Sequence, residues 1–139
     1  MMTKETKIER MNTFRPPFLD LFECVITDVN PTDGICEMEF NISQQFCHSG
    51  NIIQGGFVTA MLDSVSSHAA FGMNDKIVAI STLELKVSYL APSFNGKYRA
   101  IGKVEKLTRN FGFLTAELFN DAGERTAILS STAKISYLK

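Results

Sequence analysis

The chain has 139 residues, of which 45% are hydrophobic, and its formal net charge is -1. This length and composition predict one globular domain with a sizeable core. The charge is nearly neutral and the lysines and arginines are scattered, so the chain lacks the basic surface of a nucleic-acid-binding protein, and we expect no nucleic-acid partner.

The first ten residues are charged and contain no apolar segment of the kind found in signal peptides or membrane spans. We therefore expect a cytoplasmic protein that has no membrane partner.

The three cysteines, Cys24, Cys36 and Cys47, are odd in number and lack paired short spacings. This pattern argues against a disulfide framework and against a structural metal, so we expect reduced thiols, no metal and no cofactor. Cys47 is followed directly by His48, but neighbours in an extended segment point to opposite faces, which disfavours a thiol-imidazole dyad.

The predicted elements begin with a loose or helical lead-in over residues 1–19, which Arg15-Pro16-Pro17 ends because the residue before a proline disfavours helix. Next come a strand from Leu21 to Val29, a turn over residues 30–34 and a returning strand from Ile35 to Asn41. A buried helix follows at about residue 54, and four strands come after it, at 77–90, 97–107, 111–120 and 125–137. The order predicts an α+β domain over residues 20–139, in which a curved antiparallel sheet is wrapped around one long central helix.

Asp63 is the single formally charged residue between Phe40 and Asn74. The run around it has helical spacing, with an apolar side formed by Val58, Met61, Leu62, Val65 and Ala69. A second stripe is small or polar and consists of Gly56, Thr59, Ala60, Asp63 and Ser67. A buried carboxylate in such a helix lowers stability, so its presence indicates a role. We predict a functional site at Asp63. The alternative is a carboxylate that is hydrogen-bonded to hydroxyl or backbone groups inside the core.

The glycine pair Gly55-Gly56 opens this helix. Free N–H groups and the positive end of the helix dipole are exposed there, which suits a developing oxyanion. Such pairs also serve tight packing, but here the pair lies about two turns before Asp63 on the same helix, and the combination favours a site.

The strand over residues 77–90 is apolar on both faces in its first half, where Val78, Ile80 and Thr82 alternate with other apolar residues. We predict that this half is covered on both faces or pairs edge to edge with a partner subunit.

These features together resemble the hotdog-fold acyl-CoA thioesterases of the PaaI-like, phenylacetate-degradation type. The resemblance covers roughly residues 20–137 and depends on Gln54-Gly55-Gly56, on Asp63 and on the strand and proline over residues 81–92. It implies a hotdog fold, an acyl-CoA substrate and a homodimer as the minimal unit, with pairing into a homotetramer expected. It also implies active sites at the subunit interface.

Roles for individual residues follow from the resemblance. It implies that the N–H of Gly55 polarises the thioester carbonyl and that Asp63 acts as nucleophile or as general base for water. Thr82, contributed by the other subunit, would orient that water. The resemblance assigns substrate binding to the start of the helix, at Asn51, Gln54 and Gly56.

The chain has two histidines, His48 and His68. His48 stands where the family has asparagine or glutamine, and it could hold the water or donate toward the carbonyl; a packing or solvent role for it stays open. His68 falls about 140 degrees round the helix from Asp63, so we interpret it as structural.

The predicted function is hydrolysis of an acyl-CoA thioester to free acid and coenzyme A. A non-catalytic acyl-CoA-binding protein is the alternative, and a dehydratase that pairs His48 with Asp63 is a weaker third. Several apolar residues could shape an acyl pocket or belong to the core, namely Phe46, Ile52, Ile53, Phe57 and Ile80.

Overall fold

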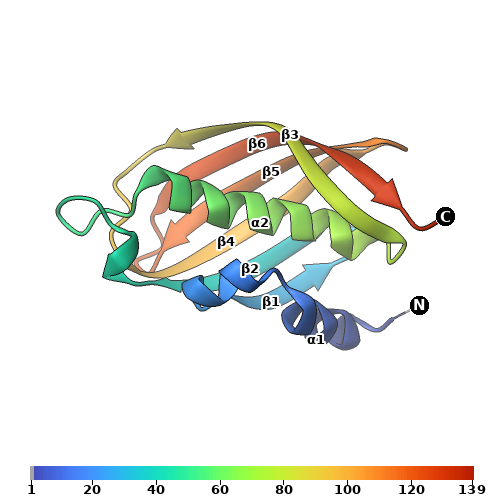
Figure 1. Ribbon diagram of the computed structural model, residues 1–139, viewed down its shortest axis with the longest axis horizontal. Helices are drawn as coiled ribbons and strands as arrows, with labels where there is room; N and C mark the ends of the chain where they lie inside the picture. Colours follow the sequence, from blue (N-terminus) through green and yellow to red (C-terminus); the bar gives the residue numbers. More distant parts are fainter. Residues whose placement is uncertain (1) are drawn as a thin grey trace.

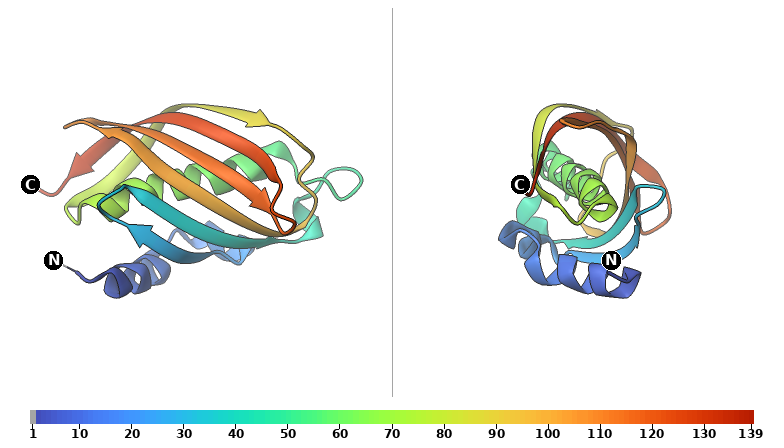
Figure 2. Two further views of the ribbon diagram at one scale, coloured as in Figure 1. Left: turned by 180° about the vertical axis from the view of Figure 1, so that it is seen from behind. Right: turned by 90° about the vertical axis from the view of Figure 1, so that its right-hand side faces the viewer.

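The computed structural model of the protein describes residues 2–139. One antiparallel sheet has the strand order β1-β2-β4-β5-β6-β3. Its strands are β1 (Val25–Asn30), β2 (Ile35–Ile42), β3 (Ile77–Tyr89), β4 (Gly96–Leu107), β5 (Phe111–Asn120) and β6 (Arg125–Tyr137). The sheet curls around the long helix α2 (Gly55–Met73), as Figures 1 and 2 show. The hotdog fold predicted from the sequence is thereby confirmed.

The apolar side of α2 faces the sheet. All five residues of the predicted core side, from Val58 to Ala69, are at most 1% exposed. Gly102 of β4 lies directly beneath the helix, where a Cβ would come 2.2 Å from the carbonyl oxygen of Val65. The missing side chain therefore lets the helix approach the sheet backbone closely.

The β1–β2 hairpin turns at the predicted position. The Asn30 side-chain oxygen accepts hydrogen bonds from the backbone N–H groups of Thr32 and Asp33, and Gly34 has a φ of 67°. A left-handed backbone of this kind favours glycine, which explains why the turn ends there.

The N-terminal segment forms α1 (Lys4–Phe14) and a short 3-10 helix, η1 (Pro17–Phe22). The predicted start of the first strand, at Leu21, was wrong, because Leu21 belongs to η1 and β1 begins at Val25. Pro17 starts η1, and Glu23, with a left-handed φ of 48°, ends it before the chain can become extended.

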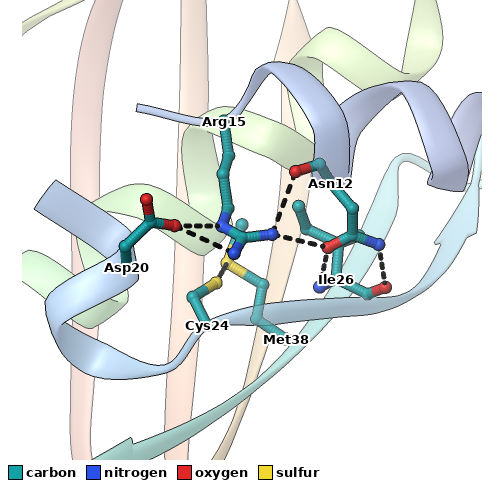
Figure 3. Close-up of polar contacts among 6 residues, drawn as sticks. All are labelled: Asn12, Arg15, Asp20, Cys24, Ile26 and Met38. Carbon is teal, nitrogen blue, oxygen red and sulfur yellow. Dashed lines mark hydrogen bonds and ion pairs between the residues drawn. The ribbon is translucent and has the colours of Figure 1, made fainter. Parts of the chain in front are cut away.

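Asn12 ties α1 to β1, as Figure 3 shows. Its Nδ2 donates to the Ile26 carbonyl at 2.9 Å, and its Oδ1 accepts from the Ile26 N–H at 2.8 Å. Arg15 extends the same network to Asp20 at 2.9 Å. The lead-in is thus attached to the sheet by directed polar contacts.

Lys7 connects α1 to the far end of α2. Its Nζ is buried and donates to the Gly72 carbonyl at 2.7 Å, and it forms an ion pair with Asp75 at 2.9 Å. The last turn of α2 contains no basic residue of its own, so this lysine supplies the cation that favours a helix C-terminus.

None of the helices within residues 2–139 combines the length and the apolar character needed to cross a membrane.

Candidate active site

The loop before α2 is held by its own polar groups. After the short 3-10 helix η2 (Gln44–Phe46), Gly50 and Asn51 have φ angles of 59° and 60°. The Asn51 side-chain oxygen accepts from Gln44 Nε2 at 2.8 Å. Asn51 therefore takes the left-handed conformation that asparagine tolerates, and its side chain serves the loop.

One amide is left free at the start of α2. Gln54 Oε1 accepts from the N–H of Gly56 at 2.7 Å, and the Gln54 carbonyl accepts from Phe57 and Val58. Within residues 2–139, no group accepts a hydrogen bond from the N–H of Gly55. A helix N-terminus with one unpaired donor is a local site for a partial negative charge.

A small pocket opens beside Gly55, with a volume of about 210 Å³. Its walls are mostly apolar and come from the loop, from α2, from the end of β3 and from the segment after β3: His48, Ile52, Ile53, Val58, Tyr89, Ala91, Pro92 and Ser93. His48 Nδ1 accepts from the Ser49 N–H at 2.7 Å, so its Nε2 is left for other partners. The structure thus brings His48 and Gly55 to one pocket.

Asp63 lies half-buried in the middle of α2. Its Oδ1 accepts from the Thr82 hydroxyl at 2.8 Å, and within the described residues Asp63 takes part in no ion pair. Ser66 donates to the backbone carbonyl of Asp63 and not to the carboxylate. One carboxylate oxygen therefore has a fixed partner, and the group is not sealed in the core.

The origin of Thr82 differs from the prediction. We expected this hydroxyl to reach the acid from another subunit, but the Thr82–Asp63 hydrogen bond forms within one protomer. The reason is the curl of the sheet, which brings β3 alongside α2 of the same chain.

Gly55 and Asp63 both lie on α2, but they cannot act on the same carbonyl within one protomer. Eight residues of helix correspond to about 12 Å along the axis. Reacting groups must approach to about 3–3.5 Å of the atoms on which they act. One protomer thus holds the donor and the acid at two separate positions.

His68 and two of the cysteines are buried away from this site. The ring Nδ1 of His68 donates to the Ser64 carbonyl at 2.7 Å, and burial lowers the pKa of His68 below its ordinary value. Burial raises the pKa of Cys24 to about 11, and it raises the pKa of Cys36 as well, so both are protonated thiols. Cys47 is a free, half-buried thiol.

No cluster of three or more histidine, cysteine, aspartate or glutamate side chains within residues 2–139 is arranged to hold a metal ion.

Sequence reasoning missed Tyr89, the last residue of β3. Its hydroxyl donates to the Gly55 carbonyl at 2.9 Å and lies 2.8 Å from Thr59 Oγ1. The signal available in the sequence was a tyrosine at the end of an apolar strand, just before the Leu90-Ala91-Pro92 break. This signal gave no reason to connect Tyr89 with the helix start.

The fold and the residues on α2 define the class of protein: a hotdog domain with an acid in mid-helix and a glycine pair at the helix start. Residues 50–127 match the family model of the Thioesterase superfamily, which is more than half of the chain. The chain belongs to the thioesterase superfamily.

A curated relative agrees with this assignment. A protein of Saccharolobus solfataricus that is named as an esterase is 29% identical over 76 residues, or 55% of this chain. The match covers 54% of that relative, so the chain spans about half the length of the curated protein that it matches.

Solved structures match over nearly the whole chain. A thioesterase-named, phenylacetic acid degradation-related protein of Ralstonia eutropha JMP134 has 27% identity and a TM-score of 0.83, over 92% of this chain and 98% of that one. The E. coli PaaI protein from the phenylacetic acid degradation operon has a TM-score of 0.82 over 96% of each chain. Its sequence identity is 14%, so this second likeness concerns the fold.

Proposed function

We propose that the protein hydrolyses an acyl-CoA thioester to a free acid and coenzyme A. The observation that carries the proposal is the half-buried Asp63 carboxylate, which is held by Thr82 and has no cation partner within the described residues. Membership of the thioesterase superfamily supports the same reaction class.

The chemistry needs two groups. The free N–H of Gly55 donates to the thioester oxygen and stabilises the negative charge that develops there. Asp63 either takes a proton from a water that adds to the carbonyl carbon, or attacks that carbon itself to give a mixed anhydride that water then opens. In both routes the C–S bond breaks and coenzyme A leaves as a thiolate, which is a good leaving group.

We propose a homodimer as the working unit. The donor and the acid of one protomer lie about 12 Å apart along α2, so a carbonyl would use Gly55 of one copy and Asp63 of the other. β3 is an edge strand of the sheet, and Val78 and Leu83 on it are 54% and 58% exposed. An edge strand that exposes such apolar side chains favours a cover, and a second β3 in antiparallel pairing provides one.

A tetramer made of two such dimers is a further part of the proposal. Phe111 and Phe113 of β5 are exposed on the sheet and offer apolar surface for the second contact.

The substitution Asp63→Asn tests the acid. We expect thiol release from a panel of acetyl-, butyryl-, octanoyl- and phenylacetyl-CoA to fall by at least about 100-fold, since the variant loses its base or nucleophile. The exposed turn residue Asp121 provides the matched control, Asp121→Asn, which should keep the wild-type rate. Circular dichroism checks that both variants fold.

Absence of turnover by the wild-type protein on the whole panel would contradict the proposal. Binding of acyl-CoA measured by calorimetry, without hydrolysis, would instead indicate the non-catalytic acyl-CoA-binding protein.

A further inference from the structure

Tyr89 spans from the end of β3 to the first turn of α2. It is 53% exposed, yet its hydroxyl does not simply face water. It donates to the Gly55 carbonyl at 2.9 Å and lies 2.8 Å from the hydroxyl of Thr59, one turn further along α2. Since the phenol has one proton, Thr59 is the donor in the second bond, and the three groups form a chain from Thr59 through Tyr89 to Gly55.

The contact of Tyr89 with Gly55 is close enough to explain the glycine. A Cβ at position 55 would lie 3.1 Å from Tyr89 Oη and 3.2 Å from Cζ. Any other residue would press against the ring. The lack of a side chain at Gly55 therefore lets Tyr89 reach the backbone, in addition to leaving room in the pocket that both residues line.

The N–H of Gly55 is the one N–H of the first turn of α2 that lacks an acceptor within residues 2–139. A donor that acts on a developing oxyanion must be held in place before the reaction, because small displacements reduce its effect strongly. The carbonyl of the same residue accepts a hydrogen bond from Tyr89, so the tyrosine restrains the backbone of Gly55.

We propose that Tyr89 is a positioning residue that holds the Gly55 amide at the angle needed for the thioester carbonyl, with Thr59 orienting the tyrosine hydroxyl. This inference rests on the proposed function of Gly55 as the oxyanion donor. It assigns to the end of β3 a role in the rate of hydrolysis that is separate from subunit pairing.

The test compares Tyr89→Phe with wild type on the acyl-CoA substrate that is turned over fastest. The ring remains and the hydrogen bond is lost, so kcat should fall about tenfold while KM changes less than about twofold, because the donor acts mainly in the transition state. Thr59→Val should lower kcat in the same way, and Thr59→Ser should recover the rate, because serine restores the hydroxyl. The double variant Tyr89→Phe/Thr59→Val should have a kcat no lower than that of the slower single variant, because the two substitutions break the same chain of hydrogen bonds.

Tyr137→Phe is the matched control. Tyr137 pairs with Ile77, at the opposite end of the β3–β6 ladder from Tyr89, and its loss of a hydroxyl should leave kcat unchanged. A wild-type kcat in Tyr89→Phe, an effect confined to KM, or additive effects of the two single variants would overturn the proposal.

A second measurement does not depend on activity. In backbone NMR relaxation the Gly55 amide of the wild type should be rigid, with an order parameter of about 0.85, and Tyr89→Phe should lower it while Tyr137→Phe does not. If the wild type hydrolyses no thioester, the proposed function fails, and this measurement still decides whether Tyr89 restrains Gly55. An unchanged Gly55 order parameter in Tyr89→Phe would overturn the positioning role.

Discussion

One backbone amide and one carboxylate carry the chemistry proposed for this protein. The amide of Gly55 has no acceptor within residues 2–139, whereas the next N–H along the helix, that of Gly56, donates to the Gln54 side chain. The carboxylate of Asp63 has the hydroxyl of Thr82 as its partner. Each group thus has a polar neighbour that orders the backbone or side chain around it: the Gln54 cap lies beside the Gly55 amide, and the Thr82 hydroxyl binds the Asp63 carboxylate.

His68 gives a prediction at the same scale. Burial lowers its pKa below the ordinary value of 6.5, so the unfolded chain binds the proton more readily than the folded one. The free energy of unfolding should therefore fall as the pH drops below about 6.5, and should be free of this effect above it. His68→Leu should show a weaker fall between pH 6.5 and 5 in urea denaturation. An identical pH dependence in the variant would contradict the assignment.

At the scale of elements, the central contact is that of α2 with β4. Gly102 allows this contact because its missing Cβ would lie 2.2 Å from the Val65 carbonyl oxygen. Backbone on both sides of the contact leaves no flexible side chain to move aside. The helix and sheet must therefore separate if a side chain is added there.

Gly102→Ala is expected to lower the free energy of unfolding by about 3 kcal/mol or more, because overpacking here meets backbone. Gly123→Ala is the matched control: its φ is 84° and its surroundings are open, so strain alone should cost about 1 kcal/mol. The midpoints of urea denaturation compare the two. Equal losses of stability would show that the close packing of α2 on β4 does not limit stability.

Sequence periodicity predicted most elements because their faces differ sharply in polarity. The bounds of β5 and β6 agree with the prediction, and the Asn30–Gly34 turn is specified by local side-chain bonds. The prediction of the first residue of β1 was wrong because η1 also contains apolar residues. The spacing of apolar residues in so short a 3-10 helix does not distinguish it from the beginning of a strand.

Part of the site could not be predicted for a different reason. Asp63 and Gly55 stand out in the sequence by charge and by glycine content. The Tyr89–Gly55 bond joins residues 34 positions apart, and the choice of protomer for Thr82 depends on how tightly the sheet curls. These relations belong to the three-dimensional fold, which local pattern does not specify.

At the scale of the whole molecule, the two edges of the sheet differ. β1 is covered along part of its length by α1, whereas β3 at the other edge has thirteen residues and, within residues 2–139, is hydrogen-bonded to one strand, β6. An edge strand of this length that exposes Val78 and Leu83 favours pairing with another copy. The proposed dimer would place its two-fold axis near the middle of β3, at Leu83.

Leu83→Lys should weaken this pairing, because the substitution brings two like charges together across the axis. We expect analytical ultracentrifugation to show monomers and the thioesterase rate to fall by at least about tenfold, since each site would need both copies. Val25→Lys, at the opposite edge of the sheet, is the control and should keep both the assembly and the rate. A fully active monomeric Leu83→Lys variant would contradict the shared site.

The anchoring of α1 has a consequence for the order of events during folding. An isolated helix of eleven residues is marginal in water, and this one is polar. Its attachment points, Ile26 and Gly72, are synthesised later. Because α1 is synthesised before both attachment points, it must wait for the central helix, and we expect it to dock last, on a domain that has already collapsed.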